Sequence, residues 1–124
     1  MQKLLKKSFA VIAAFLLIGS LAACASTEPL DMKSVTAVID VRTPEEFATG
    51  HLDGAVNIDV ESADFATQIE ALDKAGNYVV YCHSGRRAGI AVDAMTAAGF
   101  TGNLVNAGGI ADATTTTGLP IVTQ

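Results

Sequence analysis

The feature that most constrains the fold is the alternation, after residue 35, of short apolar runs with segments of helical spacing. The strongest strand is predicted at Tyr78–Tyr81, and a helix is predicted soon after it, over Arg87–Ala98. Strands that alternate with helices in this way are typical of a parallel sheet with helices on both faces. The sequence therefore predicts a small α/β domain whose functional site lies at the carboxyl ends of strands.

Local signals place the remaining elements. Thr43 can cap a short helix that ends near Thr49, because Pro44 suits its first position and Glu46 completes a capping box. Further strands are predicted at Val35–Val41, Ala55–Ile58 and Leu104–Val105, and a helix at Ser62–Ala75. The Gly108-Gly109 pair is expected to break the chain, Thr114–Thr117 to form a surface loop, and Pro120–Val122 to close the domain.

The first 23 residues have the layout of a secretory signal. Lys3, Lys6 and Lys7 make a basic start, the apolar run Phe9–Ile18 follows, and small residues precede Cys24. The apolar run is shorter than the roughly 20 residues that span a bilayer. We therefore predict a signal peptide over residues 1–23.

The residues Leu21-Ala22-Ala23-Cys24 resemble a bacterial lipobox. The resemblance implies that Cys24 is diacylated and anchors an exported protein to the extracytoplasmic or periplasmic face of the cell membrane, since two acyl chains suffice for stable anchoring. An ordinary secreted protein with a chance cysteine here is the alternative. Residues 24–33 are then the lipidated N-terminus and a polar tether, and residues 34–124 are the folded domain.

The predicted mature chain is strongly acidic. Three of the eight basic residues leave with the signal, so five remain against 13 acidic residues, a net charge of −8. A chain of this net charge is not expected to bind nucleic acid through its phosphates, and it offers no basic face to anionic lipid. The lipid on Cys24 is therefore the expected membrane contact.

The segment between the Tyr78–Tyr81 strand and the next helix carries the strongest signal for chemistry. It reads Cys82-His83-Ser84-Gly85-Arg86-Arg87. The N–H groups of a short loop that enters a helix can form an anion-binding nest, and the helix N-terminus adds positive charge. Two arginines strengthen this field, so every contribution favours the thiolate of Cys82, which is the nucleophilic form.

Two alternatives assign Cys82 a structural role. It could be an inert buried cysteine at a strand end, because cysteine is often buried. It could also form a disulfide with Cys24, but that would require a lipid-anchored residue to reach the active edge of the sheet. The glycine, the two arginines and the helix start favour a functional cysteine.

The loop resembles the active-site loop of the single-domain rhodaneses, the thiosulfate sulfurtransferases. The resemblance covers nearly all of residues 35–122. It includes Val38–Phe47 as the first strand and turn, Gly50–Ile58 as the second segment, and Ala98–Phe100 and Asn106–Ile110 as elements after the loop. It implies a rhodanese-like three-layer α/β fold.

The resemblance also implies a mechanism without a metal or organic cofactor. Cys82 would take the sulfane sulfur from thiosulfate or a similar donor and pass it to cyanide or a thiol. The N–H groups of His83 to Arg87 would cradle the persulfide, Arg87 would close the loop, and Arg86 would face outward and attract anionic donors. Asp40, pairing with a basic or N–H group, and Arg42 would support the loop.

Loop length distinguishes two chemistries on this fold. Four residues separate Cys82 from Arg87, whereas phosphatase and arsenate-reductase relatives have one more residue to hold a tetrahedral oxyanion. The shorter loop favours sulfur transfer over these activities. A third hypothesis is a module that binds or senses persulfides without turnover.

The sequence departs from the family at the position where members usually carry a tryptophan at the rim of the site. Ala113 stands there, so we expect one wall of the pocket to be smaller or differently built, which leaves the donor preference open. His83 could shuttle a proton near neutral pH but is interpreted as contributing only its N–H group. His51 is expected to be structural, and no residues show metal-ligand spacing.

Overall fold

The computed structural model describes residues 30–124. The predicted signal peptide and Cys24 lie outside these residues, as does most of the tether, so these assignments stay predictions. None of the helices within residues 30–124 is long and apolar enough to cross a membrane.

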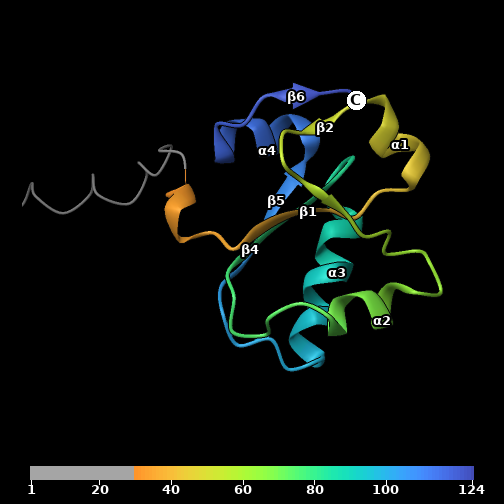
Figure 1. Ribbon diagram of the computed structural model, residues 1–124, viewed down its shortest axis with the longest axis vertical. Coiled ribbons are helices and arrows are strands. Elements are labelled where there is room, and N and C mark those ends of the chain that lie inside the picture. Colours follow the sequence, from red (N-terminus) through yellow and green to blue (C-terminus); the bar gives the residue numbers. More distant parts are fainter. Residues whose placement is uncertain (1–29) are drawn as a thin grey trace, which may run out of the picture.

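The centre of the domain is a four-stranded parallel sheet with strand order β3-β1-β4-β5 (Figure 1). The strands are β1 (Ala37–Asp40), β3 (Val56–Asn57), β4 (Tyr78–Cys82) and β5 (Leu104–Gly109). The two inner strands are β1 and β4, and all five residues of β4 are buried. The sheet confirms the predicted fold class, and the carboxyl end of its most buried strand is Cys82.

Helices cover both faces of the sheet, so the domain has three layers (Figure 1). One face carries α2 (Phe65–Glu70) and α3 (Arg86–Ala97). The other carries α4 (Ile110–Thr117), with β2 (His51–Leu52) and β6 (Ile121–Val122) pairing as a small antiparallel sheet beside it. The short 3₁₀ helix η3 (Met32–Ser34) precedes β1.

Alternate residues of β4 point into two separate cores. Tyr78, Val80 and Cys82 belong to the core beneath α2 and α3. Val79 and Tyr81 belong to the core beneath α4. This period of two fixes Cys82 on the α3 face of the sheet, where α3 begins.

Helix α1 (Pro44–Thr49) forms as the local signals predict. The Thr43 hydroxyl accepts a hydrogen bond from the Glu46 N–H at 3.2 Å, and the Glu46 carboxylate accepts one from the Thr43 N–H at the same distance. The capping box is therefore complete, and Gly50 follows the last helical residue.

The prediction of a surface loop at Thr114–Thr117 is wrong, because these residues form the second half of α4. Two of the threonine hydroxyls are satisfied within the helix: Thr114 donates to the Ala111 carbonyl and Thr117 to the Ala113 carbonyl. Ala113 and Thr117 are buried, and packing of this kind overrides a weak helix propensity.

Strand β5 and helix α2 differ most from their predicted extents. Strand β5 does not end before the Gly108-Gly109 pair, because a bulge lets Gly109 pair with Cys82. Helix α2 is shorter than Ser62–Ala75, because the Ser62 hydroxyl and the Asp73 carboxylate accept local N–H groups in turns at its two ends.

Candidate active site around Cys82

Cys82 ends the central strand with its side chain fully buried. The backbone N–H of Gly85 donates to the Cys82 sulfur at an N–Sγ distance of 2.8 Å. Gly85 immediately precedes α3, so the sulfur also lies beside the positive end of the helix dipole. Both contributions stabilise negative charge on the sulfur.

The loop requires glycine at position 85. Its φ of +103° is in the left-handed region, which side chains rarely adopt. A Cβ there would also lie only 3.3 Å from the Gly108 Cα of the neighbouring strand. Gly85 therefore allows the N–H to turn toward the sulfur and the loop to approach β5.

The loop also rests directly on the end of β5 at Gly109. A Cβ at Gly109 would overlap the carbonyl oxygen of His83 and lie 3.3 Å from the Ser84 Cα. No side chain separates the two backbones at this contact, so the position of the loop depends on the absence of a side chain at residue 109.

The side chains of His83, Ser84 and Arg86 are exposed. The exposed His83 agrees with its interpretation as a donor of backbone N–H only. Arg86 has no ion-pair partner within residues 30–124, so its charge is available at the mouth of the site.

Arg87 makes an ion pair with two carboxylates. Its guanidinium donates to Glu46 at 2.8 and 3.0 Å and to Glu61 at 3.4 Å. The hydrogen bonds to Glu46 raise the pKa of Arg87, and the charge of the Cys82 thiolate acts in the same direction. Arg87 therefore joins the start of α3 to Glu46 of α1 and to Glu61.

The same ion pair lowers the pKa of Glu46 to about 2, chiefly through the hydrogen bond from Arg87. Glu46 thus contributes stability that is fully present above its ordinary pKa of 4.5 and is lost as the pH falls toward about 2. We expect Glu46→Gln to lower the free energy of unfolding at neutral pH by about 1–2 kcal/mol, a value discounted for the partly exposed carboxylate. Urea unfolding at a series of pH values measures the difference, which should vanish as the pH falls through this interval.

Glu45→Gln is the matched control for this change. Glu45 is the neighbouring residue of the same helical turn, is exposed, and makes no side-chain hydrogen bond within residues 30–124. Glutamine at position 46 can still complete the capping box, so only the ion pair is tested. Equal losses from both substitutions would contradict a specific role for the Glu46–Arg87 pair.

Asp40 and Arg42 form a buried ion pair at the end of β1. The closest approach is 2.7 Å from Arg42 Nη2 to Asp40 Oδ2, and the same nitrogen donates to the Gly50 carbonyl. Burial alone would lower the pKa of Arg42, but the hydrogen bonds and charge of Asp40 raise it. Asp40 pairs with a basic group as expected, and the arginine of the pair also donates to Gly50, which precedes β2. Arg42 overlies the ring of Tyr81, the residue before Cys82.

His51 lies outside the site and has structural contacts. Its ring stacks on Phe47 with a centroid distance of 3.6 Å, and its Nδ1 is 2.9 Å from the Phe47 carbonyl oxygen. The structural interpretation of His51 is therefore confirmed.

The structure places Ala113, which stands where the family usually carries a tryptophan, in the core. This side chain is fully buried in the core beneath α4, together with Tyr81 and Ala107. The helical phase of α4 turns residue 113 toward the sheet, and the smaller or differently built pocket wall stays a prediction.

Sequence reasoning missed the partners that hold the loop in place. Glu46 was interpreted as a capping residue only, although its capping box leaves the carboxylate able to pair with Arg87 41 residues away. Asn106 was not singled out, and it donates to the Gly85 carbonyl oxygen. Only the tertiary arrangement reveals either contact.

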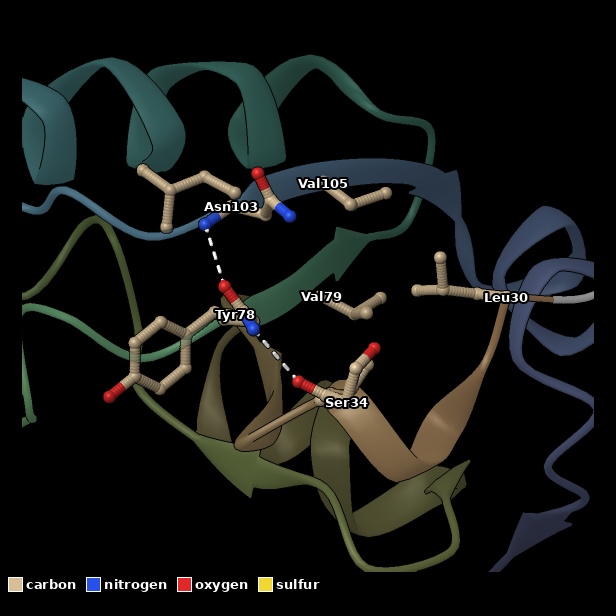
Figure 2. Close-up of a pocket in the computed structure, with 9 residues that line it drawn as sticks. Leu30, Ser34, Tyr78, Val79, Asn103 and Val105 are labelled. Atoms are coloured by element: carbon tan, nitrogen blue, oxygen red, sulfur yellow. Dashed lines mark hydrogen bonds between the residues drawn. The ribbon is translucent and has the colours of Figure 1, made fainter.

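A separate pocket of about 180 Å³ lies at the amino ends of β4 and β5 (Figure 2). Leu30 lines one side, and Val79 and Val105 line another. Cys82 is at the opposite end of β4, so this pocket is not part of its site. No cluster of metal-ligating side chains occurs in the described part of the chain.

Known proteins are similar to this chain in sequence and in fold. The family described as Rhodanese-like domain matches residues 26–115. Thiosulfate sulfurtransferase PspE of Escherichia coli is 36% identical over 74 residues, which cover 60% of this chain and 70% of that protein. Thiosulfate sulfurtransferase 16, chloroplastic, of Arabidopsis thaliana is 38% identical over 74 residues, covering 52% of this chain and 62% of that one.

A solved structure supports the same assignment. The structure described as a rhodanese with anions from E. coli superposes with a TM-score of 0.58 at 34% sequence identity. The match covers 71% of this chain and 98% of that one, so it extends over nearly all of the solved chain.

Proposed function

Because the chain belongs to the family of rhodanese-like domains, we propose that it transfers a sulfane sulfur through a persulfide on Cys82. The observation that carries the proposal is the 2.8 Å contact between the Gly85 N–H and the Cys82 sulfur at the start of α3. This contact stabilises a thiolate, and a thiolate is the form that attacks sulfur.

The first step forms the persulfide. The Cys82 thiolate attacks the outer sulfur of thiosulfate or a similar donor, and a new S–S bond forms. The S–S bond of the donor breaks, and sulfite leaves with the electron pair. The terminal persulfide sulfur carries the negative charge, which the helix N-terminus and the loop N–H groups stabilise.

The second step returns the enzyme to its starting state. The carbon of cyanide, or the sulfur of a thiolate, attacks the terminal sulfur of the persulfide. The S–S bond breaks, the product is thiocyanate or a new persulfide, and the Cys82 thiolate leaves. No metal, oxidant or reductant is needed to balance either step.

Two arginines have different roles in this proposal. Arg86 is exposed and unpaired among the described residues, so it attracts an anionic donor to the loop. Arg87 is held by Glu46 and Glu61 and positions the loop. The donor is therefore bound mainly by backbone N–H groups and Arg86.

A comparison of two assays tests the proposed function. The protein is expected to form thiocyanate from thiosulfate and cyanide and not to hydrolyse a generic aryl phosphate, because the loop has four residues between Cys82 and Arg87. Phosphate hydrolysis without thiocyanate formation would favour the phosphatase alternative. A persulfide on Cys82 that forms without turnover to thiocyanate would favour the module that binds or senses persulfides.

A further inference from the structure

We propose that Asn106, on the neighbouring strand β5, is a positioning residue that fixes the Cys82 loop in its reactive conformation. Its Nδ2 donates to the Gly85 carbonyl oxygen at 3.3 Å. Gly85 is the residue whose N–H contacts the Cys82 sulfur. Asn106 therefore holds the residue that stabilises the thiolate, and its relevance to sulfur transfer rests on the proposed function.

The second bond of Asn106 fixes the orientation of its amide. The Gly108 N–H donates to Asn106 Oδ1 at 2.8 Å. The oxygen must face that N–H and the nitrogen must face the Gly85 carbonyl, because the N–H can only donate and the carbonyl can only accept. The side chain thus links the end of β5 to the loop.

The bulge in β5 explains why Asn106 can reach the loop. Val80 pairs with Asn106, but Cys82 pairs with Gly109, so β5 has one extra residue between the two pairs. Gly108 takes a φ of +80° within this irregular stretch, and its Cα would lie 3.3 Å from a Cβ at Gly85. The bulge brings β5 against the loop. Asn106 forms one hydrogen bond with Gly85 of the loop and one with Gly108 of β5.

Helix α3 has no side-chain cap of its own. Gly85 occupies the capping position and offers no side chain, and the side chains of His83 and Ser84 are exposed. The Gly85 carbonyl oxygen accepts the first helical bond from the Gly89 N–H at 3.1 Å and the bond from Asn106. Asn106 therefore restrains the carbonyl side of Gly85, while the N–H of the same residue contacts the Cys82 sulfur. Glycine is the most flexible residue type, so this restraint acts at the most flexible residue of the loop.

Loss of this bond should change the reactivity of Cys82 more than the stability of the fold. Asn106 is exposed, so a smaller side chain leaves no buried cavity. Without the bond, Gly85 can turn its N–H away from the sulfur, and the thiolate loses a donor.

The experiment measures alkylation of Cys82 by iodoacetamide in the wild-type protein and in Asn106→Ala and Asn106→Asp. Alanine removes both hydrogen bonds, whereas aspartate keeps an acceptor for the Gly108 N–H and loses only the donor to Gly85. Asn103→Ala and Asn103→Asp are the matched controls, because Asn103 is exposed, lies just before β5, and has no side-chain bond to the loop. Thermal unfolding confirms that each variant is folded.

Both Asn106 variants should react about tenfold more slowly than wild type at neutral pH. Loss of the Asn106–Gly85 bond weakens the hydrogen bond from Gly85 to the thiolate, and a tenfold change in rate corresponds to the loss of about one such bond. The difference should disappear at alkaline pH, where the thiolate forms without help from the loop. The Asn103 variants should react at the wild-type rate. A purely structural role would not produce this dependence on pH.

Three results would overturn the proposal. Wild-type rates in both Asn106 variants would show that the bond does not position the loop. Slowing in the alanine variant alone would assign the effect to the lost acceptor for the Gly108 N–H in the bulge. Slowing in the aspartate variant alone would assign the effect to the added negative charge. Alkylation reports on Cys82 whether or not sulfur is transferred, so failure of the proposed function, seen as no persulfide on the wild-type protein, is a separate outcome.

Discussion

Replacement of Cys82 by serine is expected to abolish sulfur transfer. A serine hydroxyl is not ionised at neutral pH and cannot form the persulfide that both steps require. Loss of a nucleophile from a reaction that proceeds through it lowers the rate by on the order of 10⁴-fold or more. Thiocyanate formation from thiosulfate and cyanide measures the loss.

The fold should tolerate this substitution well enough for the result to be interpreted. Serine has nearly the shape of cysteine, and its hydroxyl can accept the Gly85 N–H that contacts the sulfur in the wild-type protein. We therefore expect the Cys82→Ser protein to unfold cooperatively on heating. Transfer retained by a folded Cys82→Ser protein would refute the role of this residue.

Gly109→Ala should have the second-largest effect on transfer. The added Cβ would overlap the His83 carbonyl oxygen and lie 3.1 Å from its carbonyl carbon, so the loop or the end of β5 must move. A displacement of about 1 Å at a reacting group can cost on the order of 100-fold in rate. Overpacking of this kind should also destabilise the fold by about 1–3 kcal/mol. Transfer is measured well below the melting temperature, so that the rate refers to folded protein.

Gly89→Ala provides the matched control. Gly89 lies in α3 one turn from the loop, and a Cβ there would meet Asn106 Nδ2 at an ordinary contact distance of 3.5 Å. Alanine in a helix is favoured over glycine by about 0.5–1 kcal/mol, so this variant should be slightly more stable and equally active. A Gly109→Ala protein with wild-type transfer and stability would show that the loop does not rest on Gly109.

The parts of the fold that depend on neighbouring residues are predictable from the sequence. The capping box of Thr43 and Glu46 fixes the start of α1, and the buried run Tyr78–Tyr81 fixes the position of Cys82 after it. These signals lie within a few residues of the structure that they specify. The sequence accordingly identifies the loop and the edge of the sheet at which it lies.

The parts that depend on distant residues are not predictable in this way. The threonine-rich half of α4 is helical because Ala113 and Thr117 pack on the sheet, and that packing has no local signal. The contacts of Arg87 with Glu46 and of Asn106 with Gly85 join residues 41 and 21 positions apart. Their partners are set by strand order and by the bulge in β5, which the sequence does not reveal.

The intact mass of the purified protein after incubation with thiosulfate and removal of the excess tests the central claim most directly. The account predicts a gain of the mass of one sulfur atom on the wild-type protein and none on Cys82→Ser. Addition of cyanide should then restore the original mass. A wild-type protein whose Cys82 is reduced and open to alkylation, but which gains no sulfur from thiosulfate, would contradict the account.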